Sequence, residues 1–242
     1  MIKFFKKTRY DLMENNKTGK YFKYAIGEIV LVVIGIMIAL SINNWNENRK
    51  LDEIKQIYYH QLEKDLESEI QNLNSRIIEL NESIDTYNTY KEYTKNSNLK
   101  LVEIIQAINK VEINWKYLYF YSNTIETLEL TGDIKLIPPI LRTKLIGLRR
   151  MQESLITIAN SNDNIYFIGL EKAGDLGFNS SLDKSNKVIE QKIKQNYLDI
   201  ILTMESSLGL KNFTEKIKNQ RLKTILEKVE ELKSLVEQEL ER

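Results

Sequence analysis

Few residues in this chain have the types and spacing that chemistry requires. The single histidine, His60, stands near Glu63 and Asp65, and histidine with carboxylates can ligate zinc. A lone histidine beside acids on a charged helix is usually solvated, so we expect no metal there. The sequence contains no HExxH, GxSxG, Walker or CxxC motif, and no pair of carboxylates stands out for acid–base catalysis. We therefore predict no catalytic residue, no metal and no cofactor, and a protein that is not an enzyme.

Glu28 is the ionisable residue with the most unusual position, because it interrupts the apolar run AIGEIVLVVIGIMIALSI at residues 25–42. Such a group at the centre of a span costs on the order of 2.5 kcal/mol or more, which calls for a functional hypothesis. On a helix, Glu28, Gly35 and Ala39 lie on one side, and small residues four apart let a second helix approach. We predict a membrane helix interface at these three residues. The alternative is a Glu28 that reaches interfacial water and has a minor structural role.

The apolar run has the length of a membrane span. At about 1.5 Å per residue it covers roughly 27 Å, close to the ~30 Å hydrocarbon core. Tyr24 and Trp45 flank it, where interfacial aromatic anchors lie. Lys and Arg are more frequent before the run than after it, which predicts a cytoplasmic N-terminus and an extracytoplasmic remainder. The alternative is a cleaved signal peptide that ends near residues 39–41.

Composition predicts long helices and argues against several classes of protein. The 242 residues include only two Pro and nine Gly, so helix-breaking signals are scarce. The net charge of +1 balances 35 bases against 34 acids, and no basic block lies outside residues 1–23, so we expect no nucleic-acid partner. Cysteine is absent, which excludes disulfides and cysteine-based metal or redox sites.

A heptad pattern follows the span. Apolar residues alternate at spacings of four and three along a coiled-coil seam, namely Leu66, Ile70, Leu73, Ile77, Leu80 and Ile84. A second seam lies near the C-terminus, at Leu222, Ile225, Val229, Leu232 and Val236. Ile at position a with Leu at d favours a parallel two-stranded coiled coil, but three heptads do not separate pairing between chains from packing within one chain. We favour antiparallel packing of the two seams within one chain over pairing of each seam with its own copy.

The region between the seams predicts shorter elements. A helix over residues 124–130 should end at Gly132, which tolerates the left-handed conformation. Residues 134–137 should form an extended crossing before Pro138 and Pro139, which suit the first turn of the next helix. Glycine and polar residues predict a loop over residues 160–186, followed by a helix that breaks near Gly209. We expect the dense aromatic cluster to belong to the core; its members are Trp115, Tyr117, Tyr119, Phe120 and Tyr121.

The run YAIGEIVLVVIGIMIALSINNWNE at residues 24–47 closely resembles the opening of a large family of bacterial single-pass membrane proteins of unknown function. A second match resembles the middle signature of that family, a helix of the type ETLxxxG and an Ile/Leu-rich turn; here it comprises Glu126, Thr127, Leu128, Gly132, Ile134, Leu136 and Ile137. Family members usually carry a Ser-Gly or similar pair in that turn, where this chain has Thr131 and Gly132. The resemblance supports the topology and a bacterial inner-membrane location, and it implies no activity.

These observations predict an all-α protein with a single N-terminal transmembrane helix, a helical stalk or coiled coil and an extracytoplasmic helical bundle. We expect a basic cytoplasmic tail at residues 1–23, the span at 24–45, the stalk at 46–97, a central helical region with a loop at 98–183, and C-terminal helices at 184–242. The expected partners are the lipid bilayer and either a second copy or another membrane protein. The predicted function is that of an oligomeric scaffold or accessory subunit. The alternatives are a ligand-sensing bundle that signals through a separate partner and, third, a hydrolase built from scattered carboxylates.

Overall fold

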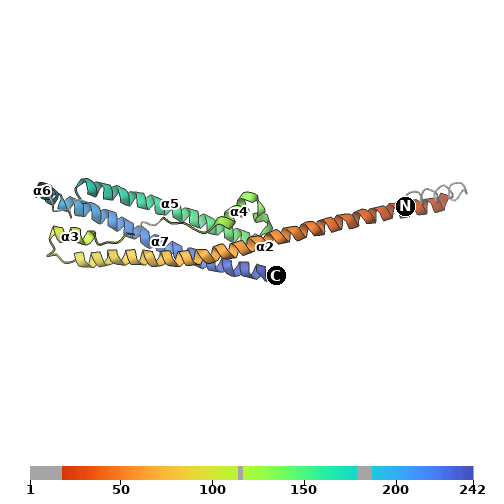
Figure 1. The fold of residues 1–242 in the computed structure, drawn as a ribbon, viewed down its shortest axis with the longest axis horizontal. Coiled ribbons are helices and arrows are strands. Elements are labelled where there is room, and N and C mark those ends of the chain that lie inside the picture. Colours follow the sequence, from red (N-terminus) through yellow and green to blue (C-terminus); the bar gives the residue numbers. More distant parts are fainter. Residues whose placement is uncertain (1–17, 114–116, 179–186, 242) are drawn as a thin grey trace. The chain divides into compact units, whose positions relative to one another are not determined.

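A computed structural model describes residues 18–113, 117–178 and 187–241 of the chain. All regular elements in these residues are helices, which confirms the predicted all-α class (Figure 1). Their order is α2 (Thr18–Thr94), α3 (Leu101–Ile108), α4 (Asn123–Thr131), the 3₁₀-helix η1 (Asp133–Leu136), α5 (Pro139–Asp175), α6 (Lys187–Gln195) and α7 (Tyr197–Leu240).

The chain divides into two compact units, Met1–Gln56 and Ile57–Arg242. In the first unit, the described residues belong to α2, which contains a stretch that is long and apolar enough to cross a membrane. No residue of this stretch is buried in the protein, and large aliphatic side chains such as Leu31 and Met37 are exposed along it. A helix that is apolar on all sides needs an apolar environment. This unit therefore supplies one candidate membrane span or signal anchor.

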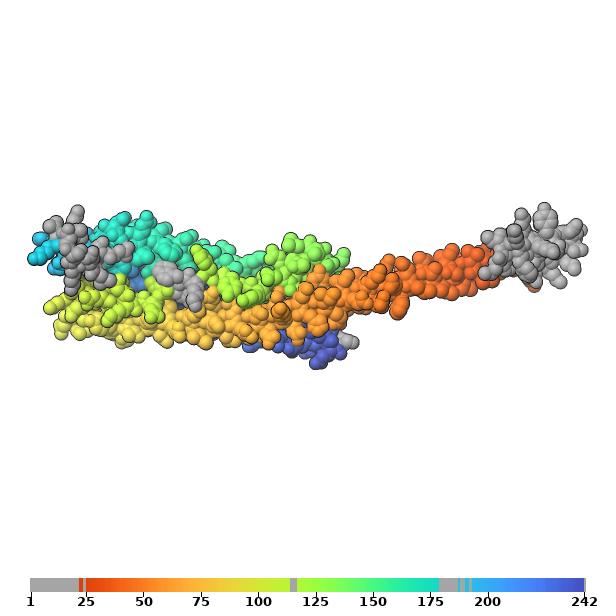
Figure 2. Space-filling model, in the orientation of Figure 1, coloured from red at the N-terminus to blue at the C-terminus, as the bar shows by residue number. Residues whose placement is uncertain are grey.

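In the second unit, residues 57–94 of α2 pack with α5 and α7. Lys144 pairs with Glu231, Asp163 with Lys211, and Gly169 lies against Ser207, so α5 and α7 run antiparallel. Hydrogen bonds from α2 reach both of the other helices, at Gln152 of α5 and Glu215 of α7. The three helices therefore form a triangular bundle, and their side chains fill the space between the ribbons (Figure 2).

The bundle holds two apolar clusters. The first contains both heptad seams: Leu66, Leu73 and Leu80 are buried in it, Ile70 and Ile77 are partly buried, and Leu222, Ile225, Val229, Leu232 and Val236 pack in the same cluster. The seams thus meet inside one chain. The second cluster lies where α3 covers α7 and includes Tyr90, Ile105, Tyr166, Ile200 and Met204. Ile84 is buried but belongs to neither cluster.

The turn around Gly132 matches its prediction only in part. Gly132 ends α4 with a φ of 78°, the left-handed conformation that the sequence predicted. The predicted extended crossing at residues 134–137 was wrong, because residues 133–136 form η1. The Tyr58 hydroxyl donates a 2.8 Å hydrogen bond to Asp133 Oδ2 at the start of η1. Ile137 is buried at its end, and these two contacts hold the tight turn in place.

The predicted loop at residues 160–186 was wrong over residues 160–175, and residues 179–186 lie outside the described part. Helix α5 continues to Asp175, and the predicted break near Gly209 is absent because α7 is continuous there. Gly169 has a packing role rather than a turn role. A Cβ atom at this position would lie 1.8 Å from Ser207 Oγ and 2.8 Å from Ser207 Cβ, so the two backbones approach more closely than any other residue permits.

Gly169→Ala is expected to destabilise the bundle by roughly 1–3 kcal/mol, because the new methyl group overpacks the contact with Ser207. Gly147 provides the matched control, since it lies in the same helix with no atom within 4 Å of its Cβ position. Gly147→Ala is expected to stabilise by roughly 0.5–1 kcal/mol through helix propensity. Denaturant unfolding followed by circular dichroism measures both changes. Equal effects of the two substitutions would contradict the proposed role of Gly169.

Candidate functional site

The predicted membrane interface lies in the first unit. No atom lies within 4 Å of the Gly35 Cβ position, Ala39 is exposed and Glu28 is half-buried. Trp45 is exposed. The side chain of Tyr24 is not among those that the structure describes. The interface at Glu28, Gly35 and Ala39 stays a prediction. Residues 1–17 of the predicted basic tail also lie outside the described part.

His60 does not assemble a metal site with its neighbours. Its Nδ1 atom lies 3.7 Å from Glu63 Oε2, and the imidazole is largely exposed to solvent. Within the described ranges, no group of three His, Asp or Glu side chains is arranged to hold a metal ion.

The aromatic segment after α3 packs differently from the prediction. Leu118 and Phe120 pack against the first apolar cluster, whereas Tyr117, Tyr119 and Tyr121 are exposed. This alternation is that of an extended chain, which places every second side chain on the same side. The prediction of a core role was therefore wrong for the three tyrosines, and Trp115 lies outside the described residues.

Side chains of α2 hold this extended segment in place. Asn72 Nδ2 and Arg76 Nη2 donate hydrogen bonds to the carbonyl oxygens of Tyr119 and Tyr117, at 3.0 and 3.1 Å. The Arg76 guanidinium also lies 5.3 Å from the centre of the Tyr119 ring, within the range of a cation–π contact.

Glu69 is a fully buried carboxylate that joins α2 to two other segments. Its Oε2 atom accepts a 2.7 Å hydrogen bond from the Tyr121 backbone N–H, and its Oε1 atom accepts one of 3.3 Å from Gln152 Nε2. Gln152 Oε1 has no hydrogen-bond partner among the described residues. Burial raises the pKa of Glu69 to about 7, although these hydrogen bonds act in the opposite direction. Glu69 therefore changes its protonation state near neutral pH.

A polar layer crosses the middle of α7. Its buried members on this helix are Lys211, Asn212, Thr214, Glu215, Lys218 and Asn219. Lys211 forms ion pairs with Asp163 of α5 and, at 3.6 Å, with Glu215. Glu215 Oε2 accepts a 2.8 Å hydrogen bond from Ser83 of α2. Burial raises the pKa of Glu215, while the Ser83 bond and the charge of Lys211 lower it.

Lys218 differs from Lys211 because its side chain forms no ion pair or hydrogen bond with a described residue, although the residue is only 9% exposed. Burial and the nearby charge of Lys211 lower its pKa, while Asp163 and Glu215 act in the opposite direction. Lys218→Met is expected to raise the free energy of unfolding by roughly 1–3 kcal/mol, since methionine fills the site without a desolvated charge. Lys216→Met at an exposed position of the same turn is the control, and denaturant unfolding is the measurement. A loss of stability in the Lys218 variant would contradict this interpretation.

One side of α5 and α7 is exposed and apolar. On α7, Leu202, Ser206, Leu210 and Phe213 are spaced by four, four and three residues, and on α5, Ile158, Ser161, Ile165 and Ile168 are spaced by three, four and three. Each set therefore lies along one side of its helix. We call these eight residues the α5/α7 face.

The two halves of the α5/α7 face adjoin on the side of the bundle away from α2. Gln152 and Glu215 occupy the sides of α5 and α7 that contact α2, and Gly169 and Ser207 occupy the sides that contact each other. The remaining side of each helix contacts neither α2 nor the other helix of the pair, and it carries the four residues of the α5/α7 face. Phe213 is 59% exposed, and Ile165 and Ile168 are 50% and 52% exposed.

The α5/α7 face carries no charged residue. Asp163 and Glu205, which lie in the same stretches, point to Lys211 and to Tyr90 and Lys91 instead. Charged residues flank the face on α7, where the exposed Asp199 and Lys216 lie three residues beyond its two ends on the same side of the helix. The core of a protein–protein interface shows the same loss of charge, and isolated apolar residues on a monomer surface do not.

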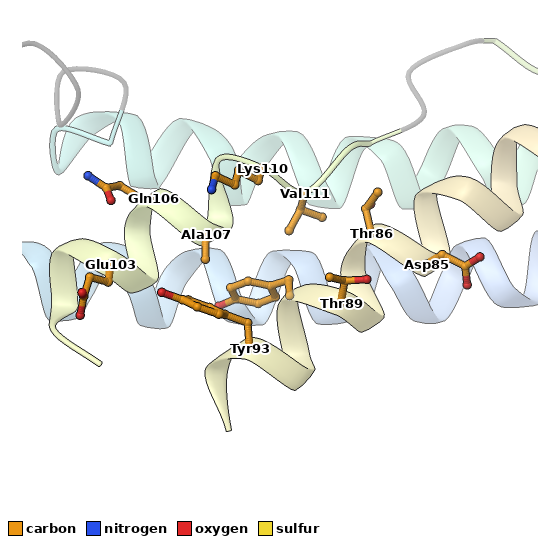
Figure 3. Close-up of a pocket in the computed structure, with 10 residues that line it drawn as sticks. Asp85, Thr86, Thr89, Tyr93, Glu103, Gln106, Ala107, Lys110 and Val111 are labelled. Atoms are coloured by element: carbon orange, nitrogen blue, oxygen red, sulfur yellow. The ribbon is translucent and has the colours of Figure 1, made fainter. Parts of the chain in front are cut away.

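A pocket of about 460 Å³ lies between the end of α2 and α3 (Figure 3). From α2 it is lined by Asp85, Thr86, Thr89, Tyr90 and Tyr93, and from α3 and the residues after it by Glu103, Gln106, Ala107, Lys110 and Val111. Its volume is within the range of ligand pockets, roughly 300–1,000 Å³. The Tyr90 hydroxyl donates a hydrogen bond to Glu205 of α7, and Lys91 Nζ lies 2.8 Å from the same carboxylate. The Tyr90 ring is therefore held in a fixed orientation.

Sequence reasoning did not find the buried polar residues, the α5/α7 face or this pocket. One signal was available, because Leu202, Leu210 and Phe213 lie on the opposite side of α7 from Ile200, Met204 and Ser207. A helix with apolar residues on two sides has two partners. The pocket had no such signal, since its lining comes from two elements whose contact depends on the tertiary fold.

The described residues define the class of protein, an all-α chain with one helix that is long and apolar enough to cross a membrane and a bundle of long helices. The model of a family of unknown function, DUF6090, matches residues 28–167, which is more than half of the chain. The protein belongs to this family. No curated protein and no solved structure shows a significant match.

Proposed function

We propose that the protein acts through protein–protein contacts as a membrane-anchored homo-oligomer, without catalysing a reaction, and that the α5/α7 face joins two copies. The observation that carries this proposal is the exposed, charge-free apolar surface on two neighbouring helices. The helices α2, α5 and α7 leave this side of the bundle uncovered. Two helices of another molecule would cover it and, with α5 and α7, enclose an apolar layer between four helices.

A second copy is the occupant that the surface favours. A two-fold axis through the face places α5 and α7 of one copy against the same helices of the other, so each apolar set meets an apolar set. No charge on either face opposes this contact. Ser161 and Ser206 are small and allow the helices to approach closely. Anchoring in one bilayer keeps two copies parallel and raises their effective concentration.

The proposed location is the bacterial inner membrane, with the N-terminus in the cytoplasm and the bundle outside. The excess of Lys and Arg before the span supports this orientation. A reporter enzyme that is active only outside the cytoplasm, fused after Arg242, tests it. Within the bilayer, the Gly35 and Ala39 pair would bring the spans of two copies together, and Gly35→Leu would weaken that contact.

Phe213→Lys is expected to convert the oligomer into a monomer, because it places a charge within the apolar face at its largest exposed side chain. Light scattering after size-exclusion chromatography in a mild detergent gives the molar mass of the protein. Ile140→Lys is the matched control, since Ile140 is an exposed apolar residue of α5 outside the face. A monomeric parent protein, or an oligomer that both substitutions leave intact, would contradict the proposal. Co-purification of a different protein at fixed stoichiometry would assign the face to that partner instead.

A second candidate function is ligand sensing, in which the bundle binds a small molecule and signals through a separate partner. The pocket between α2 and α3 favours it, because its volume and mixed lining are those of a ligand site.

A further inference from the structure

The pocket between α2 and α3 has an apolar middle and a charged end. Tyr90, Tyr93, Ala107 and Val111 supply aromatic and aliphatic surface. Figure 3 shows Glu103 and Gln106 at one end of the pocket and Asp85 at the other. Lys110 lies beside Ala107, with its nitrogen directed toward the Glu103 end, and the Tyr93 hydroxyl is directed toward the same end. A ligand that fills this space needs an apolar body with its polar groups gathered at one end.

An acidic and a basic side chain line the pocket from the same side of the α3 segment. Glu103, Gln106 and Lys110 are spaced by three and four residues, so they lie on the same side of the α3 segment. Glu103 Oε2 accepts a hydrogen bond from the Lys100 backbone N–H. The backbone N–H of Lys110 donates to the Ala107 carbonyl oxygen, and its ammonium group forms no ion pair or hydrogen bond with a described residue. The pocket thus contains an acceptor for an ammonium group at Glu103 and a donor for a carboxylate at Lys110, about two helical turns apart on the same wall, with Gln106 between them in the sequence.

From this arrangement we propose that the pocket binds a small zwitterion, with ammonium and carboxylate groups next to each other at one end of an apolar body. This is the chemistry of an apolar or aromatic α-amino acid. The carboxylate would pair with Lys110, the ammonium group with Glu103, and the side chain would lie on the rings of Tyr90 and Tyr93. A purely cationic ligand would leave Lys110 facing a like charge, and a purely anionic ligand would do the same to Glu103.

Binding of free amino acids to the full chain in detergent tests the proposal. Isothermal titration with L-phenylalanine, L-tyrosine, L-tryptophan, L-leucine and L-methionine is expected to detect at least one of them at millimolar or lower concentration. The N-acetyl derivative of the amino acid that binds lacks the ammonium group, and the amide of that amino acid lacks the carboxylate. Each derivative should bind at least about tenfold more weakly than the amino acid itself. Absence of binding by all five amino acids, or equal affinity for the derivatives, would overturn the proposal.

Variants locate the binding to this pocket. Lys110→Ala and Tyr93→Ala remove exposed side chains and are each expected to weaken binding by about tenfold or more. Tyr117→Ala is the control, because Tyr117 is an 85% exposed tyrosine outside the pocket. Full affinity in both pocket variants would also overturn the proposal. The proposal is independent of the α5/α7 face, so Phe213→Lys should leave amino-acid binding unchanged whatever its effect on the molar mass.

Discussion

Replacing Glu215 with alanine is expected to lower the free energy of unfolding by about 3–5 kcal/mol. The substitution removes one acidic partner of Lys211, leaves the ion pair with Asp163 in place, and removes the negative charge closest to Lys211 along α7. It also deprives the buried Ser83 hydroxyl of an acceptor 2.8 Å away. Removal of one member of a buried ionic group is costly because the remaining charge stays desolvated. Denaturant unfolding followed by circular dichroism measures the loss.

Two further variants separate the charge of Glu215 from its hydrogen bond. Glu215→Gln keeps an acceptor for Ser83 and should cost less than the alanine variant. Glu230→Ala, at an exposed position of the same helix, should change stability by no more than about 0.5 kcal/mol. A Glu215→Ala protein as stable as its parent would show that the polar layer contributes nothing to the bundle.

The stability of the protein is expected to decrease between about pH 4.5 and pH 7 through the titration of Glu69. The pKa of Glu69 is about 7 in the folded chain and 4.5 as a model value, so the folded state holds the proton more tightly. The stabilising contribution of the protonated form is complete below pH 4.5 and is lost as the pH rises through 7. The difference between these two pKa values corresponds to about 3 kcal/mol in the free energy of unfolding.

Glu69→Gln tests this titration, because glutamine keeps the size and an acceptor but cannot ionise. As the pH rises from about 4.5 to 7, the free energy of unfolding of the variant should increase by about 3 kcal/mol relative to that of the parent. Glu67→Gln, at an exposed position two residues away, should show no such gain. A parent and a Glu69→Gln protein with parallel pH profiles would contradict the assignment. Protonated Glu69 also has a ready acceptor, since Gln152 Oε1 has no described hydrogen-bond partner.

The elements with strong periodicity could be predicted from the sequence. The long apolar helix, both seams and the Gly132 cap depend on local patterns, namely an apolar run, a heptad spacing and a residue that tolerates positive φ. The errors at Gly169 and Gly209 share a cause. Glycine was interpreted as a helix breaker, but in α5 it permits the close approach of Ser207, a requirement that only the packed partner reveals.

The candidate sites could not be predicted in the same way, because their residues come together only through tertiary contacts. Glu69, Glu215 and Lys218 look like ordinary surface positions in a highly charged helix. The burial of Glu69 depends on α5 and the segment after α3, and that of Glu215 and Lys218 depends on the packing of α7 against α2 and α5. The pocket combines α2 with α3, and the α5/α7 face needs the antiparallel register of two helices that are far apart in sequence.

Disulfide cross-linking in native membranes tests the central claim, assembly through the α5/α7 face, most directly. The chain has no cysteine of its own, so single substitutions at Ile165, Ile168, Leu210 and Phe213 report on this face alone. A cysteine at Leu130, an exposed residue of α4 outside the face, is the control. We expect a covalent dimer from one or more of the four face positions and none from the control. Monomers from all four face positions, or equal cross-linking at Leu130, would contradict the claim.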